Sequence, residues 1–153
     1  MRLGEEGYVY LLNRDNLGGY KQGVGGGDSV VQRIGPRGGV WGRAGVWPGD
    51  GGYVYIPTSS GLASGGLLDV YKYGLSGSGS PSLSLVASSS DAFGFGSGPP
   101  VITSNGTQSG SALVWIIWSA DRSGDGGQLR AYDPVPVAHP REHFQREDAL
   151  ENA

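Results

Sequence analysis

Leu113-Val114-Trp115-Ile116-Ile117-Trp118 is a run of six apolar residues between segments rich in Gly, Ser and Asp. A strand that is apolar at successive positions has no polar face to turn to water, so we expect burial on both faces. A strand of that kind lies between two layers, and stacked sheets supply such layers. The run therefore predicts a β-strand inside a stack of sheets.

Eight further strands are predicted on either side of this run, nearly all bounded by Gly, Pro, Ser, Asn or Asp. The 153 residues include 30 Gly, far above the usual ~7%, and no stretch before residue 138 has helical periodicity. The chain is thus expected to consist of strands and turns. The predicted strands are Tyr8–Leu12, Val30–Ile34, Val40–Trp47, Tyr53–Ile56, Leu67–Tyr73, Leu83–Val86, Val101–Thr103 and Gln128–Tyr132, beside Ala112–Trp118.

The strands recur at a fixed distance along the chain, which favours a repeat architecture over a β-sandwich, the alternative with many short antiparallel strands. Matching pairs 61 positions apart are Val40 and Val101, Tyr53 and Val114, Leu68 and Leu129, and Tyr71 and Tyr132. An earlier copy of one strand, Gly7–Tyr10, recurs as Gly52–Tyr55. Four strands per unit are typical of a propeller blade. We predict an all-β fold, an incomplete β-propeller of about two to three four-stranded antiparallel blades.

The propeller segment is expected to cover residues 1–137, followed by a polar, disordered tail at 138–153. We expect the first blade to be entered at about Gly7 and the last to break off after its third strand at about Asp133. Two open edges would result. No secretory signal segment is visible at the N-terminus.

Four stretches resemble the repeats of actinobacterial quinoprotein-like (PQQ-like) β-propeller proteins. They are GYVYLLNRDNLGG (7–19), GGYVYIPTSSG (51–61), PPVITSNGTQSGSALVWIIW (99–118) and GGQLRAYDP (126–134). Family members usually continue with a Thr-Gly turn and a Trp after the Ala-x-Asp of the third strand, whereas Pro134 follows here. The resemblance implies an extracellular or cell-surface origin, with this chain as an internal or truncated piece of a longer ring.

Charge and residue content exclude several function classes. The formal net charge is −3, so nucleic acid and membrane surfaces are not expected partners. The chain has no Cys, and both of its histidines, His139 and His143, fall in the predicted tail. A Ser-His-Asp relay or a Cys/His zinc site is therefore not expected in the propeller segment. The i,i+4 spacing of the two histidines could chelate a metal, but a third ligand is missing.

One calcium-loop candidate follows the apolar run. Asp121, Ser123 and Asp125 place oxygen atoms at alternate positions before Gly126, as in the first half of a calcium-binding loop. The twelfth position is Tyr132 instead of a bidentate carboxylate, so we expect an ordinary polar loop, and a calcium site at Asp121, Ser123 and Asp125 is the alternative. No cofactor is therefore expected, with calcium at this loop as the alternative.

Other segments have simpler interpretations. Asn13–Gly19 and Asn105-Gly106-Thr107 are expected to be turns, although the first invites a calcium reading and the second fits a glycosylation acceptor. The four tryptophans are expected in the core, although they could stack sugars or a quinone. They are Trp41, Trp47, Trp115 and Trp118.

The sequence contains a repeat without a catalytic constellation. We predict a non-catalytic binding or scaffold module with an unknown ligand or protein partner. The open edges would be covered by further blades or by self-association. The alternative is a fragment of a quinone-dependent or carbohydrate-active enzyme whose catalytic residues lie in missing blades.

Overall fold

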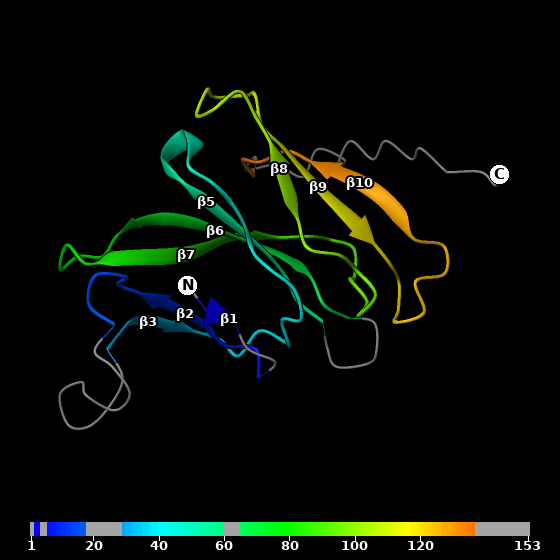
Figure 1. Ribbon diagram of the computed structural model, residues 1–153, viewed down its shortest axis with the longest axis horizontal. Helices are drawn as coiled ribbons and strands as arrows, with labels where there is room; N and C mark the ends of the chain where they lie inside the picture. Colours follow the sequence, from blue (N-terminus) through cyan, green and yellow to red (C-terminus); the bar gives the residue numbers. More distant parts are fainter. Residues whose placement is uncertain (1, 4–5, 18–28, 60–64, 137–153) are drawn as a thin grey trace.

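A computed structural model describes residues 2–3, 6–17, 29–59 and 65–136, and shows three antiparallel sheets that follow one another along the chain (Figure 1). The all-β prediction is confirmed, since the described residues contain no α-helix and a single 3-10 turn at Gly49–Gly51. The strands are β1 (Arg2–Leu3), β2 (Val9–Leu12), β3 (Val30–Ile34), β4 (Gly45–Trp47), β5 (Tyr53–Pro57), β6 (Leu68–Leu75), β7 (Pro81–Ser88), β8 (Val101–Thr103), β9 (Leu113–Trp118) and β10 (Gln128–Tyr132).

All nine predicted strands are present, and β3, β8 and β10 have the predicted bounds. The predicted strand at Val40–Trp47 is shorter, because only Gly45–Trp47 joins the ladder with β5. The expected start of the first unit at Gly7 is wrong. β1 lies before Gly7 and pairs with β2, so the first sheet already has a strand there.

Each sheet joins neighbouring strands of the sequence. The orders are β1-β2-β3, β4-β5-β6-β7 and β10-β9-β8. The middle sheet has the four strands expected of a whole unit, and the other two have three strands each among the residues that the structure describes. Three strands are the expectation for the last unit. Short turns suffice for these connections because antiparallel neighbours need no crossover.

Two apolar cores hold the three sheets together. The first core lies between the β1–β3 sheet and the β4–β7 sheet and includes Val9, Val54, Ile56 and Tyr71. The second lies between the β4–β7 and β8–β10 sheets and includes Tyr55, with Val114 and Ile116 opposite. All five residues of β5 are buried, because each face of this strand meets a different core.

Cross-strand rows show how the second and third sheets correspond. One row is Val46–Val54–Tyr71 in the middle sheet and Ile102–Val114–Tyr132 in the last. Position 71 thus matches position 132, and the predicted offset of 61 is confirmed for the third strand. It is wrong for the other two strands: Val114 corresponds to Val54 rather than Tyr53, and β8 corresponds to β4 rather than to the segment at Val40. Turns of unequal length separate the strands of the two units, so no single offset fits all three.

The predicted early copy of the repeat is also out of register. Val9 faces the sheet that follows it, whereas Val54, its expected counterpart, faces the sheet that precedes it. Successive residues of a strand point to opposite faces, so a shift of one residue exchanges the two faces. The sequence Gly-Tyr-Val-Tyr recurs, but equivalent side chains of the two copies lie on opposite faces of their sheets relative to the order of the stack.

Among the described residues, β9 is covered by another sheet on one face only, contrary to the expectation from its six apolar residues. Val114 and Ile116 are buried, but Leu113 and Ile117 are 39% and 56% exposed. Alternation along the strand puts the first pair against the middle sheet and the second pair on the far side. Within the described residues, the strand buried on both faces is β5 instead.

Candidate interaction surface

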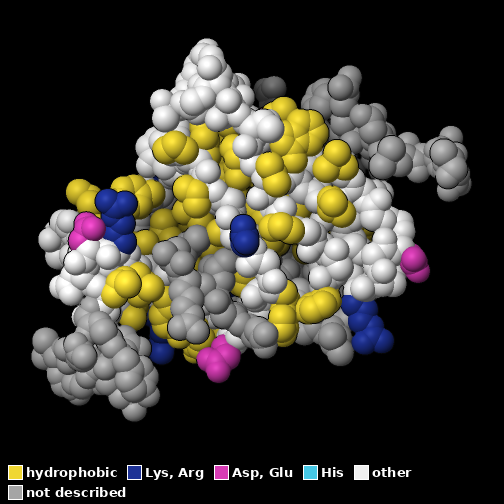
Figure 2. All heavy atoms as spheres, in the orientation of Figure 1, with side chains coloured by type: hydrophobic (Ala, Val, Ile, Leu, Met, Phe, Trp, Pro, Cys, Tyr) yellow, Lys and Arg dark blue, Asp and Glu magenta, His cyan; other side chains and the backbone are white. Residues whose placement is uncertain are grey.

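The far side of the β8–β10 sheet is an apolar surface, which we call the outer face. It consists of Val101, Thr103, Leu113, Trp115, Ile117, Leu129 and Ala131, which share one side of the sheet by register. Figure 2 shows hydrophobic side chains side by side over these strands. The large aliphatic members are between 39% and 59% exposed. Contiguous exposed apolar surface of this kind is typical of interaction sites.

The outer face carries no charged side chain among the residues named above. Its one indole N–H is satisfied within the face, because Trp115 Nε1 donates to Thr103 Oγ1 at 2.9 Å. A partner that covers this surface would therefore desolvate few polar groups, which is one of the costs of forming an interface.

A buried carboxylate fixes the connection into the middle sheet. Arg37 donates two hydrogen bonds to Asp69 on β6, each at 2.9 Å, and Ser88 Oγ donates a third at 2.6 Å. The Asp69 side chain is 1% exposed. The hydrogen bonds to Asp69 raise the pKa of the Arg37 guanidinium. This bidentate pair ties the segment before β4 to the third strand of the same sheet.

The last sheet has an equivalent ion pair in which the acidic and basic partners are exchanged. Arg130 occupies the position that corresponds to Asp69, because Asp69 pairs with Ile56 and Arg130 pairs with Ile116. Its partner is Asp91, at 2.7 Å, from the segment before β8. Arg130 also bonds Gln128 and lies 3.8 Å from the ring centroid of Trp118.

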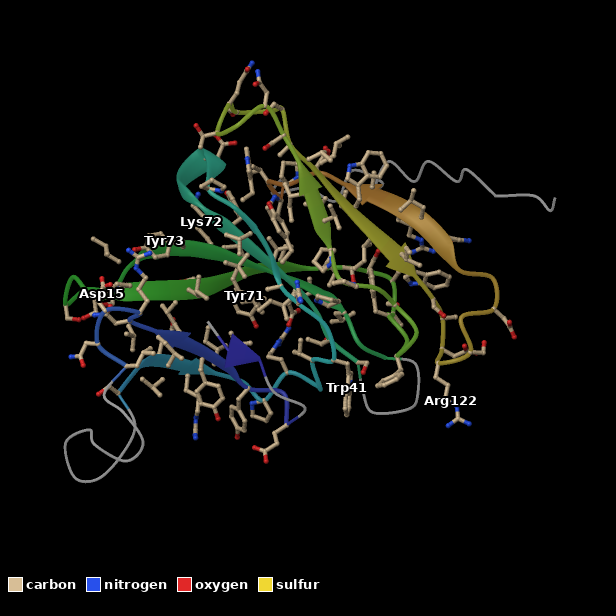
Figure 3. All side chains as sticks on the ribbon, in the orientation of Figure 1. Asp15, Trp41, Tyr71, Lys72, Tyr73 and Arg122 are labelled. Atoms are coloured by element: carbon tan, nitrogen blue, oxygen red, sulfur yellow. The ribbon has the colours of Figure 1, made fainter. Side chains whose placement is uncertain are left out.

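A buried tyrosine follows the charged residue two positions later in both sheets. Figure 3 shows Tyr71 between β6 and the β1–β3 sheet, and Tyr132 is its counterpart in the second core. Burial raises the pKa of both phenols. The sequence carries a signal for this arrangement that the prediction overlooked: Leu-Asp-Val-Tyr at 68–71 and Leu-Arg-Ala-Tyr at 129–132 place the charge and the ring at one spacing.

Tyr55 links the middle sheet to the segment after β10. Its hydroxyl donates to the Pro134 carbonyl at 2.7 Å, and the whole residue is buried in the second core. Burial raises the pKa of this phenol strongly. The ring and the hydrogen bond together hold the last two sheets in contact.

An open pocket of about 600 Å³ lies beside this link. Two carboxyl groups, Asp50 and Asp133, are among the groups that line it, together with Ser109. Asp50 has a φ of 48°, in the left-handed region, and its Oδ2 accepts from Ser109 Oγ at 3.1 Å. The rim suits a ligand that donates hydroxyl hydrogens. Its described lining residues include no histidine, and both of its carboxyl groups are exposed.

The predicted calcium loop connects β9 to β10. Asp121 Oδ1 accepts from the amide and the hydroxyl of Ser123, both at 2.8 Å, and Ser123 Oγ accepts from the Asp125 amide at 3.0 Å. The hydrogen bonds from Ser123 lower the pKa of Asp121. Arg122, beside it, points away from the sheets (Figure 3). The three oxygen-bearing residues thus lie in one turn, and calcium binding there stays a prediction.

The remaining predicted sites are placed as follows. Asn13 Oδ1 accepts from the Asp15 amide at 3.0 Å, and Asn105 lies at the β8–β9 turn. The turn predictions are confirmed at Asn13–Leu17 and at Asn105–Thr107, whereas Gly18 and Gly19 lie outside the described residues. Trp47 is a core residue as expected. Trp41 is not, because it is exposed and contacts Phe95 edge to face. His139 and His143 lie outside the described residues.

No group of three or more His, Cys, Asp or Glu side chains is arranged to hold a metal ion within the part of the chain that the structure describes. The same residues contain no helix that is long and apolar enough to cross a membrane. Comparisons of the chain with protein-family models, curated proteins and solved structures return no match.

Proposed function

We propose that the chain is a β-propeller segment of the quinoprotein-like repeat type that serves as a non-catalytic scaffold or binding module. One observation carries the proposal: three consecutive antiparallel sheets stack face on face in chain order, and the last two share the same cross-strand rows. Consecutive sheets of blade size in this order are the local architecture of a propeller. The four quoted repeat stretches support the same family, and with it an exported origin.

The chemistry of the described residues favours binding over catalysis. The sequence has no Cys, and its two histidines are at 139 and 143. Two charged side chains of the described residues are buried, Asp69 and Arg130. Each forms an ion pair that connects the third strand of its sheet to the segment before that sheet. These two charged side chains therefore face neighbouring segments of the same chain and not a ligand site.

Enzyme assays with the quinone test this proposal against its main alternative, a propeller enzyme fragment. The purified chain is mixed with pyrroloquinoline quinone and calcium, and oxidation of primary alcohols and aldose sugars is followed with an artificial electron acceptor. We expect no turnover above a heat-denatured control. Turnover that requires the folded chain would overturn the scaffold proposal.

A further inference from the structure

The outer face of the β8–β10 sheet corresponds to a surface that is covered within the same molecule. The row Gly45–Tyr55–Val70 of the middle sheet matches the row Val101–Trp115–Ala131 of the last sheet. The first row lies under the β8–β10 sheet, and Gly45 is small enough there for Ile102 to approach closely. The equivalent row of the last sheet is uncovered in the described residues.

Pro57 and Leu68 extend this correspondence along the strands. They pair with each other and are buried, and Ile117 and Leu129 pair in the same way at the edge of the outer face. In the last sheet, both side chains are about half exposed, at 56% and 49%. The outer face therefore has the residue types of a sheet-to-sheet contact without the contact.

At the opposite end of the stack, one face of the β1–β3 sheet carries the half-buried rings of Tyr8 and Tyr10 and the exposed Arg33. Val9 and Ile34 of the β1–β3 sheet point into the first core, so Tyr8, Tyr10 and Arg33 lie on the other side. Arg33 sits over the Tyr8 ring, 4.7 Å from its centroid, and the two tyrosine rings are 6.3 Å apart. Tyr and Arg are enriched at protein interfaces because they combine a large apolar surface with a polar tip.

The outer face and the face of Tyr8, Tyr10 and Arg33 lie on the two different sides by which successive sheets of the molecule meet each other. At each of the two contacts inside the molecule, the later sheet packs on the sheet before it. The side that the later sheet uses carries Val54 and Tyr71 in the first core, and Val114 and Tyr132 in the second core. In the β1–β3 sheet, Tyr10 and Arg33 pair with each other on that covering side and have no earlier sheet beneath them among the described residues. A chain with both faces can supply its own partner.

We propose that the outer face of the β8–β10 sheet binds the Tyr8, Tyr10 and Arg33 face of a second copy of this chain. The contact is head to tail, so the two copies use different surfaces. If the second copy returns the contact, two chains close a ring of six sheets, which is within the four to eight blades of known propellers. The inference rests on the proposed scaffold function and names its partner.

Sedimentation of the wild-type chain and two face variants tests the contact. The wild type should form a species of at least two 15.8 kDa chains as its concentration rises. Ile117→Glu charges the outer face and Tyr10→Glu charges the opposite one, so each variant alone should lose self-association at least tenfold. Leu75→Glu is the matched control, because Leu75 is 67% exposed in the β6–β7 hairpin, and it should associate like the wild type.

Mixing the two face variants separates a head-to-tail contact from other arrangements. Ile117→Glu retains an intact Tyr10 face, and Tyr10→Glu retains an intact outer face, so an equimolar mixture should form a complex of one chain of each. Circular dichroism confirms that each variant is folded, and Leu129→Glu replaces Ile117→Glu if the latter is not.

A wild-type chain that stays monomeric at every concentration would overturn the inference, as would a mixture that does not associate. Persistent association of Tyr10→Glu alone would also overturn it, because two outer faces would then bind each other. These outcomes are independent of the quinone assay, so a monomer without turnover would remove the self-association and leave the scaffold function in place.

Discussion

The β4–β7 sheet and the β8–β10 sheet share their cross-strand rows and differ in what covers them. Tyr55 in the middle sheet is buried, whereas Trp115 at the same place in the last sheet lies on the outer face. Both residues are aromatic, so the local sequence does not distinguish the two environments. Burial of a residue in a stack of sheets therefore depends on the position of its sheet in the stack.

The buried ion pairs add a second contrast between the same sheets. In each pair, the buried partner is on the third strand and the exposed partner precedes the sheet, but the sign is reversed between Asp69 and Arg130. A buried charge is tolerated only with a partner, and either sign meets that requirement. At this position, the fold thus requires that the buried charge has a partner of opposite sign, but it does not require a particular sign.

Ile116 and Ile117 are neighbours on β9 that lie on its covered and uncovered faces, so substitutions there should differ most in their effect on stability. Ile116→Ala should lower the free energy of unfolding by about 2–5 kcal/mol, because it empties space in the second core. Ile117→Ala, one residue away, should change it by about 0.5 kcal/mol or less in dilute protein. Urea unfolding followed by tryptophan fluorescence measures both. Equal losses would mean that the outer face is covered within the monomer.

Arg37→Ala should be the next largest loss, about 3 kcal/mol, because it leaves the Asp69 carboxylate buried without its cation. Asp91→Ala should cost less, about 1–2 kcal/mol, because Arg130 keeps its bonds to Gln128 and its contact with Trp118. The same urea titrations apply, with exposed Arg14→Ala as the control. The reverse order would contradict the assignment of the buried partner in each pair.

Tyr55→Phe should cost about 1–2 kcal/mol, because the Pro134 carbonyl loses its buried hydrogen bond while the ring still fills the core. Tyr73→Phe, at a tyrosine that is exposed on β6, is the matched control and should be neutral. Thermal unfolding of both variants measures the difference. No loss in Tyr55→Phe would show that water replaces the hydroxyl as a donor to Pro134.

Alkaline pH should weaken both cores through the buried phenols. The pKa values of Tyr55, Tyr71 and Tyr132 are raised by burial above their ordinary value of about 10. The folded state favours the neutral phenols, so this stabilisation is present below pH about 10 and is lost as pH rises through the raised pKa values. The melting temperature should fall as pH rises above about 10. A flat profile over that range would contradict the burial of these hydroxyl groups.

Local sequence predicts most of the strands because Gly, Ser and Asn punctuation delimits the β-branched and aromatic runs. The predicted bounds match at Val30–Ile34 and Gln128–Tyr132 for this reason. The candidate surface could not be predicted in the same way. Six apolar residues in a row indicate two faces that avoid water, but they do not say how many neighbouring sheets are present to cover them.

The sequence by itself determined an all-β chain of short antiparallel strands and the third-strand correspondence of Tyr71 and Tyr132, because strand propensity and turn residues act over a few positions. Only the tertiary structure decided the register of the other strands, the partners of Asp69 and Arg130, and the side of β9 that is left uncovered. Those features depend on contacts between segments tens of residues apart, where a shift of one residue along a strand exchanges its covered and uncovered faces.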